Sequence, residues 1–354
     1  MLNVKRIVLK IGTSVLLDKE KNISMDMVGK LARQVRTIKE KGIDTIIVSS
    51  GAIASGMEAL ALKKKPKEIE KRQALASIGQ IKLMNMYMDA FEKERLKIGQ
   101  VLLTHEDIKS KTRCLNLMNT LNSLLSMKII PVINENDALS FKEIRFGDND
   151  NLSALIAQIT DSDLLVLLSD VDGLCDKDPQ KYPDARIISV VEKIDDKIER
   201  LAFGTSSEKS TGGMVSKLEA AKKAGRYGIP TRIVRGDIEN IALRVINGED
   251  IGTLFQPESK IGRNKWWTAF AYKIKGKVWL DEGAKNAILY NGKSLLPSGV
   301  VKIEGDFSRG DCVELHNADG QTIARGITNY SSTDVNKIKG LTERSISPLI
   351  IYLY

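Results

Sequence analysis

The chain has 354 residues, 42% of them hydrophobic and 28% charged, with a formal net charge of +9. Because this length exceeds what one hydrophobic core usually holds, we expect one large and one small domain, and the ordinary charged fraction excludes a disordered chain. The longest apolar runs are far shorter than the roughly 18 residues that cross a bilayer, and the N-terminal run stops at Lys10, so we expect a cytoplasmic protein with no membrane span and no signal peptide.

The first domain, residues 1–257, alternates short β-branched runs with longer helical patterns. The runs at 6–11, 45–49, 129–133, 164–168 and 231–234 are typical of strands buried on both faces. Helices are predicted at 24–41, with Ser24 as N-cap and Gly42 just past the end, and at 71–95, 114–127, 151–160 and 215–227. This alternation predicts an α/β fold whose mainly parallel sheet lies between two layers of helices.

A polar stretch at 258–272 indicates a linker, after which the pattern changes. Short strands are predicted at 277–280, 300–304, 312–316 and 322–328, separated by glycine-containing turns. Residues 273–354 therefore form a small β-rich domain.

The first domain contains five glycine- or Asx-rich turns. Four of them follow successive predicted strands, and the fifth precedes a predicted helix. Ligands of open parallel sheets bind at the carboxyl ends of the strands, where glycines let backbone N–H groups approach phosphate and lysines supply charge. Neither GxxxxGK[ST] nor GxGxxG is present, which excludes a P-loop enzyme and a dinucleotide-binding domain. The turns lie at 10–14, 49–56, 134–137 with 147–151, 169–174 and 211–217.

Several of these segments closely resemble the glutamate 5-kinases, a branch of the amino-acid kinase family: 10–14, 50–54, 131–137, 147–154 and 211–214. The segments 281–284, 294–297 and 307–310 resemble the family's C-terminal PUA domain. The resemblance implies the amino-acid kinase fold and an enzyme that transfers the γ-phosphoryl group of ATP to the side-chain carboxylate of L-glutamate. The product is L-glutamyl 5-phosphate, made in the first step of proline biosynthesis. It also implies a homo-oligomer and feedback inhibition by proline.

Roles for individual residues follow from the same resemblance. Lys10 and Lys217 would hold the ATP phosphates, and Asp150 would organise the two lysines. Glutamate would be bound by Ser50, Gly51, Asn134, Asp137 and Asn149. The other residues expected at ATP are Gly12, Ser169, Asp170, Thr211, Gly212, Gly213, Met214, Val215 and Ser216.

This residue set suits the reaction chemically. A glutamate side chain, with a pKa of about 4.3, is already ionised at neutral pH, so no general base is needed. Catalysis would rest on alignment and on neutralising the charge of the transferred group. Mg²⁺ would be held mainly by the ATP phosphates, so no protein metal site is predicted. The three cysteines and two histidines are scattered, without the spacing of a zinc site or a disulfide framework.

Two alternatives stay open. Another member of the family could phosphorylate N-acetylglutamate, aspartate or UMP, although Asp137 suits a free ammonium group better than an acylated amine. The chain could also bind RNA through its small domain, but residues 273–354 carry 11 basic and 9 acidic side chains, which gives that alternative little support. After Gly340 the sequence departs from the family pattern, so the small domain either lacks its last strand or closes with residues 349–354.

Overall fold

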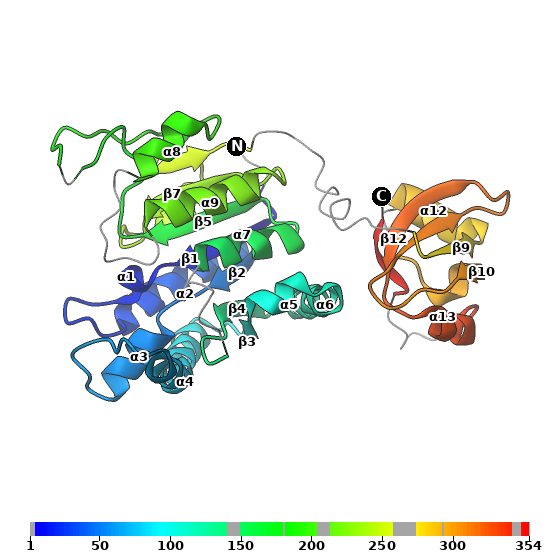
Figure 1. Ribbon diagram of the computed structural model, residues 1–354, viewed down its shortest axis with the longest axis horizontal. Helices are drawn as coiled ribbons and strands as arrows, with labels where there is room; N and C mark the ends of the chain where they lie inside the picture. Colours follow the sequence, from blue (N-terminus) through cyan, green and yellow to red (C-terminus); the bar gives the residue numbers. More distant parts are fainter. Residues whose placement is uncertain are drawn as a thin grey trace. The chain divides into compact units, whose positions relative to one another are not determined.

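A computed structural model describes residues 4–139, 149–179, 181–203, 213–257, 274–291, 294–341 and 348–353. The chain forms two compact units, Met1–Lys109 with Asn116–Ile261 and Ser110–Leu115 with Gly262–Tyr354 (Figure 1). The predicted linker, 258–272, lies outside the described residues. Within them, no helix is both long and apolar enough to span a membrane.

The larger unit is built on one eight-stranded sheet with the order β3-β4-β2-β1-β5-β7-β8-β6. All neighbours pair in parallel except β7 and β8, which are antiparallel. The prediction of a mainly parallel sheet is therefore confirmed. The strands are β1 (Arg6–Ile11), β2 (Asp44–Val48), β3 (Ile98–Leu103), β4 (Ile130–Glu135), β5 (Leu164–Ser169), β6 (Val190–Val191), β7 (Thr231–Arg235) and β8 (Thr253–Phe255).

Helices cover both faces of this sheet (Figure 1). All five predicted helices are present with ends shifted by three residues or fewer, and Ser24 caps α2 by accepting a hydrogen bond from the Met27 backbone N–H at 3.3 Å. The helices are α1 (Thr13–Leu16), α2 (Met25–Glu40), α3 (Ala52–Ala59), α4 (Ile69–Lys93), α5 (His105–Lys109), α6 (Lys111–Ser126), α7 (Asn149–Ile159), α8 (Asp196–Phe203), α9 (Met214–Gly225) and α10 (Ile241–Ile246).

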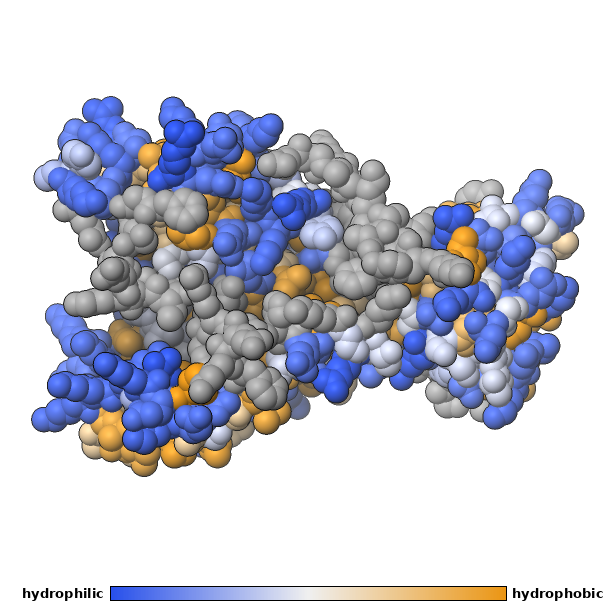
Figure 2. Space-filling model, in the orientation of Figure 1, coloured by the Kyte–Doolittle hydropathy of each residue, from blue (hydrophilic) through white to orange (hydrophobic). Residues whose placement is uncertain are grey.

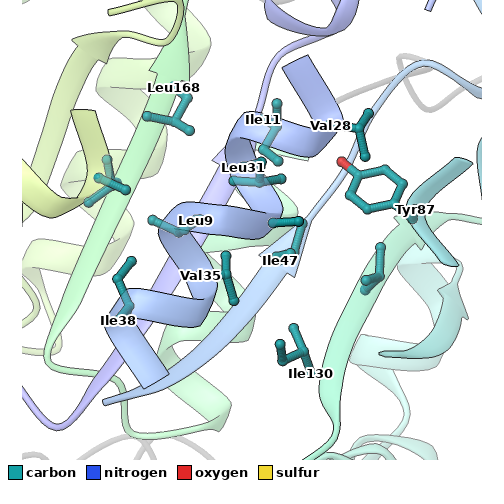
Figure 3. Packing of buried hydrophobic residues seen from close by; sticks show 14 of the residues in the cluster. Leu9, Ile11, Val28, Leu31, Val35, Ile38, Ile47, Tyr87, Ile130 and Leu168 are labelled. Atoms are coloured by element: carbon teal, nitrogen blue, oxygen red, sulfur yellow. The ribbon is translucent and has the colours of Figure 1, made fainter. Parts of the chain in front are cut away.

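The main core lies between one face of the sheet and α2, α4 and α10. Figure 3 shows strand residues such as Leu9 and Ile47 packed against Val35 and Leu31 of α2 and close to Tyr87 of α4. Since side chains alternate along a strand, Lys10 points to the opposite face from Leu9 and Ile11. That face is covered by α7, which packs on β1 and β5. The alternation of side chains along β1 thus places Lys10 next to the first turn of α7.

Helices α3 and α4 cross at two glycines. A Cβ atom on Gly79 would lie 1.9 Å from the Ala52 carbonyl oxygen, and one on Gly56 would lie 2.0 Å from that of Leu75. Any larger side chain would push the helices apart. Apolar side chains also gather on the outer surface over α3 and α4 (Figure 2), where Ile78, Ile81 and Met88 of α4 are exposed.

The smaller unit holds a five-stranded sheet with the order β10-β9-β11-β12-β13. Strand β13 pairs antiparallel with β12, so of the two predicted outcomes the sheet closes with the terminal residues. The predicted strands are present, joined by two helices that the sequence patterns did not predict. The elements are β9 (Gly276–Leu280), α12 (Glu282–Asn291), the 3₁₀ turn η2 (Pro297–Gly299), β10 (Val300–Gly305), β11 (Cys312–His316), β12 (Thr322–Thr328), α13 (Ser332–Ile338) and β13 (Ile350–Leu353).

Candidate active site

The carboxyl ends of β1, β2 and β4 and the first turns of α7 and α9 bring most of the predicted site residues together. At their centre is an ion cluster on Asp150, in the first turn of α7. Lys10 Nζ lies 2.6 Å from one carboxylate oxygen, and Lys217 Nζ lies 3.4 Å from the other. Ser216 Oγ donates to that second oxygen at 2.6 Å. The predicted role of Asp150 in organising the two lysines therefore has a geometric basis.

Burial makes this cluster electrostatically strong. Lys10, Asp150 and Lys217 are 6%, 2% and 5% exposed. Burial alone would raise the pKa of Asp150, but Lys10 and Lys217 outweigh it and hold that pKa below its ordinary value. For Lys217, burial and the neighbouring Lys10 prevail over Asp150 and lower its pKa. Two ammonium groups on one carboxylate leave a net positive charge in a poorly solvated site, where an anion is strongly stabilised.

A glycine after β1 and the N-terminus of α9 lie on the same side of the site. Gly12 N–H donates to the Leu168 carbonyl at 3.0 Å, and a Cβ on Gly12 would stand 3.8 Å from Lys10 Nζ, so the missing side chain keeps space open beside the lysine. Gly213 is the N-cap of α9, which continues through Met214, Val215 and Ser216 to Lys217. A helix N-terminus favours negative charge.

The remaining predicted ATP residues are placed only in part. Ser169 ends β5 and is buried, and its hydroxyl donates to Asp170 Oδ1 at 3.0 Å. Asp170 itself is exposed. Thr211 and Gly212 lie outside the described residues.

Asn149 joins the ion cluster to the residues predicted to bind glutamate. Its Nδ2 donates to the Ser49 carbonyl at 2.9 Å, to Ser50 Oγ at 2.9 Å and to Asn134 Oδ1 at 3.1 Å. Its Oδ1 is buried and accepts no hydrogen bond within the part of the chain that the structure describes. Beside this network Gly51 adopts φ 102°, which favours glycine, and the chain turns directly into α3.

Asp137 lines an adjacent cavity of about 310 Å³, together with Glu135, Gln80 and Ala52. Its Oδ1 is buried and has no hydrogen-bond partner among the described residues. Burial, with the negative charge of Glu135, raises the pKa of Asp137 to about 7 although Lys65 opposes the shift. A cation would bind favourably to this carboxylate, because its charge would stabilise the ionised form that burial has deprived of water.

Sequence reasoning missed two residues of this network, Gln80 and Tyr87. Asn134 Nδ2 donates to Gln80 Oε1 at 2.8 Å, and the Tyr87 hydroxyl lies 3.0 Å from Ser49 Oγ. Both residues come from α4, which was predicted only as a helix. The signal available was Gly79, because a glycine inside a long helix indicates a close backbone approach, here to the start of α3.

Two family models match the chain: the amino acid kinase family over residues 5–235 and the PUA domain over residues 276–349. A curated glutamate 5-kinase of Pelobacter propionicus is 43% identical over 99% of this chain and 94% of its own length. Those of Caldanaerobacter subterraneus and Geobacter sulfurreducens are 45% and 44% identical, with the same coverage. Among solved structures, UMP kinase from Bacillus anthracis aligns with a TM-score of 0.49 and 16% identity, over 72% of this chain and 97% of that one.

Proposed function

The chain belongs to the amino acid kinase family and, within it, to the glutamate 5-kinases, and from this premise we propose that it transfers the γ-phosphoryl group of ATP to the side-chain carboxylate of L-glutamate. The product is L-glutamyl 5-phosphate, the first intermediate of proline biosynthesis. One observation carries the proposal: a net-positive Lys10–Asp150–Lys217 cluster is joined, through the neighbouring Asn149, to residues around a cavity lined by Asp137, whose Oδ1 is buried and has no hydrogen-bond partner among the described residues.

The reaction needs alignment and charge stabilisation rather than proton transfer. An oxygen of the substrate's side-chain carboxylate forms a bond to the γ-phosphorus while the bond to the β,γ-bridging oxygen breaks, and ADP leaves with that electron pair. We assign Lys10 and Lys217 to the charge that develops on the transferred and leaving groups. Asp150 holds both ammonium groups in place before the substrates arrive, which lowers the reorganisation needed during the reaction.

ATP binding is assigned to the same edge of the sheet. Gly213, Met214 and Val215 would approach the phosphates through their backbone, and Thr211 and Gly212 extend this set by resemblance. The N–H groups of Gly12 and Ser216 already donate to the carbonyls of Leu168 and Gly213, so Gly12 would contribute the space beside Lys10, and Ser216 would contribute its hydroxyl, which holds Asp150. Ser169 and Asp170, at the end of β5, would contact the nucleotide.

Mg²⁺ is proposed to enter with ATP. Both oxygens of Asp150 already face a lysine or the Ser216 hydroxyl, so this carboxylate is not arranged as a magnesium ligand. Within the described residues, no group of three or more His, Cys, Asp or Glu side chains could hold a metal. The phosphate oxygens and water would supply most of the ligands that Mg²⁺ prefers.

Glutamate recognition is assigned to the cavity and its rim. Asp137 would pair with the substrate ammonium, and Asn149 Oδ1, Asn134, Ser50 and the backbone at Gly51 would position the rest of the molecule. An N-acylated amine is neutral and would leave Asp137 without a counter-ion. This favours glutamate over N-acetylglutamate.

The test is ADP release by the purified chain with Mg-ATP, offered glutamate, N-acetylglutamate, aspartate or UMP in parallel reactions. Hydroxylamine would trap any acyl phosphate as a hydroxamate. We expect turnover and hydroxamate with glutamate alone. Preferred turnover of another acceptor would contradict the assignment of the cavity, and the Asp137→Asn variant serves as the matched control for acceptor binding.

Four further expectations stay proposals. The exposed Ile78 and Met88 of α4 support a homo-oligomer, which light scattering coupled to gel filtration tests. Inhibition by proline is tested by adding it to the same assay.

RNA binding by the small domain is tested by a gel shift at increasing salt, and we expect none at physiological ionic strength. A cytoplasmic location is expected for an enzyme that uses ATP and glutamate.

A further inference from the structure

Gln80 occupies a fixed position on the wall of the cavity that contains Asp137. The preceding residue, Gly79, lets α4 contact the first turn of α3, because a Cβ there would lie 1.9 Å from the Ala52 carbonyl oxygen. Gln80 therefore sits close to the start of α3, beside the Ser50–Gly51 turn. The helix crossing sets where its side chain can reach.

The orientation of the Gln80 amide is set by the backbone through two asparagines. Backbone N–H groups can only donate and carbonyls can only accept, so they fix which end of a neighbouring amide is which. The Glu135 backbone N–H donates to Asn134 Oδ1 at 2.9 Å, and the Ser49 carbonyl accepts from Asn149 Nδ2 at 2.9 Å. Asn134 Oδ1 is thus an acceptor for both neighbours, and its Nδ2 must face Gln80.

The atom of Gln80 that faces Asn134 is therefore Oε1, which accepts at 2.8 Å. The other end, Nε2, carries two N–H donors, and among the described residues Gln80 makes no further hydrogen bond. Close by in the same wall, the Ser77 hydroxyl already donates to the Gln73 carbonyl at 3.0 Å. The carboxylates of Glu135 and Asp137 can only accept when ionised. The cavity is also lined by the amide side chains of Gln100 and Asn136. Gln80 is distinguished from them because its hydrogen bond to Asn134 orients its donor.

We propose that Gln80 Nε2 donates to the α-carboxylate of the acceptor substrate while Asp137 pairs with the neighbouring ammonium group. This inference rests on the proposed function and adds to it a residue that selects α-amino acids. The two groups sit on the same carbon of glutamate, so a donor and an anionic acceptor in one cavity match them. Because neither group reacts, Gln80 acts on substrate binding more than on turnover.

Two substitutions separate this role from a merely structural one. Gln80→Glu keeps an oxygen that can accept from Asn134, so the amide network survives, but it replaces the donor with an anion. Gln80→Met removes both the acceptor and the donor at similar size. Asp89→Asn, on the exposed face of α4, exchanges a carboxylate and an amide away from the cavity and serves as the control.

Steady-state kinetics of the full chain, with thermal unfolding of each variant, give the answer. Loss of a hydrogen bond to a charged group predicts a roughly ten- to hundredfold rise in KM for glutamate in both Gln80 variants, with kcat and the KM for ATP within about threefold of wild type. The rise in Gln80→Glu should equal or exceed that in Gln80→Met. Asp89→Asn should match wild type.

A near-normal KM in Gln80→Glu with a raised KM in Gln80→Met would overturn the proposal, since only support of Asn134 would then matter. A loss confined to kcat, or no change in either variant, would overturn it as well. Wild-type protein without glutamate-dependent turnover would instead reject the proposed function, so the two failures are distinguishable.

Discussion

The lysine cluster and the region around Asp137 and Asn149 differ in how their charged and polar groups are paired. Lys10 and Lys217 are buried, and both are paired with Asp150. Asp137 Oδ1, at the cavity, and Asn149 Oδ1, in the amide network that leads to it, are buried acceptors that lack partners among the described residues. The cluster therefore pairs its own charges, whereas the two acceptors are, within the described residues, available to a ligand.

The difference reflects when each region acts. Groups that stabilise a transition state are most effective when they are already oriented, so a structural counter-ion is an advantage. Groups that recognise a ground-state substrate must remain unpaired, and the free energy that burial costs them is recovered on binding. We therefore expect substitutions in the cluster to lower kcat and substitutions in the cavity to raise KM.

The largest effect is expected for Lys10→Ala. Its ammonium acts mainly on charge that develops during transfer, so kcat should fall by roughly 10²- to 10³-fold while KM for glutamate changes little. Initial-rate kinetics with both substrates varied would measure this. An unchanged kcat would remove Lys10 from the reaction.

Asp137→Asn tests the other region and should act in the opposite sense. Losing the counter-ion of the substrate ammonium predicts a roughly ten- to hundredfold rise in KM for glutamate, with kcat and the KM for ATP nearly constant. Asp137→Ala should behave similarly. A normal KM in either variant would reject the assignment.

The pKa of Asp137 adds a pH dependence. Burial raises this pKa to about 7, and only the ionised carboxylate can pair with ammonium. The kcat/KM for glutamate should therefore rise with pH through about 7 and fall up to about tenfold per pH unit below it, while kcat varies less because bound ammonium lowers the pKa. In Asp137→Asn this dependence should disappear, and its persistence would place the titrating group elsewhere.

The smallest effect is expected for Tyr87→Phe, which removes the hydroxyl next to Ser49 Oγ under both regions. One lost neutral hydrogen bond predicts a decrease of about 0.5–1.5 kcal/mol in the free energy of unfolding. Denaturant titration would measure it, and kcat should stay within about twofold of wild type. A large loss of kcat would mean that the Ser49 network orients the reacting groups directly.

The sequence predicts the central strands of the large sheet well, and the edge strands and short helices less well. Strands β1 and β5 are mainly apolar runs buried on both faces, and such a run can be recognised in the sequence without knowing which strands lie beside it. Strand β3 was missed because it is an edge strand that includes the half-buried Gly99 and the exposed Gln100. Residues 49–56 were predicted as a glycine turn but are mostly helix α3, because Gly51 makes the turn alone and Gly56 permits the contact with α4.

In the candidate site, too, the sequence identifies some features and misses others. Resemblance identified Lys10, Asp150 and Lys217, but their contacts depend on tertiary structure, since α7 places Asp150 between lysines from two distant elements. Gln80 carries no local sequence signal of function. Its proposed role depends on hydrogen bonds that connect it, through Asn134 and Asn149, to backbone atoms of β4 and of the turn after β2.

The most direct test of the separate roles of the lysine cluster and the region around Asp137 is glutamate binding to the Lys10→Ala variant. It would be measured by equilibrium dialysis with a non-hydrolysable ATP analogue and Mg²⁺. We predict a Kd within about threefold of the wild-type value in a protein whose turnover is nearly abolished. A Kd that weakens in proportion to the loss of kcat would show that the lysine cluster binds the ground state, and would contradict the separation of the two regions.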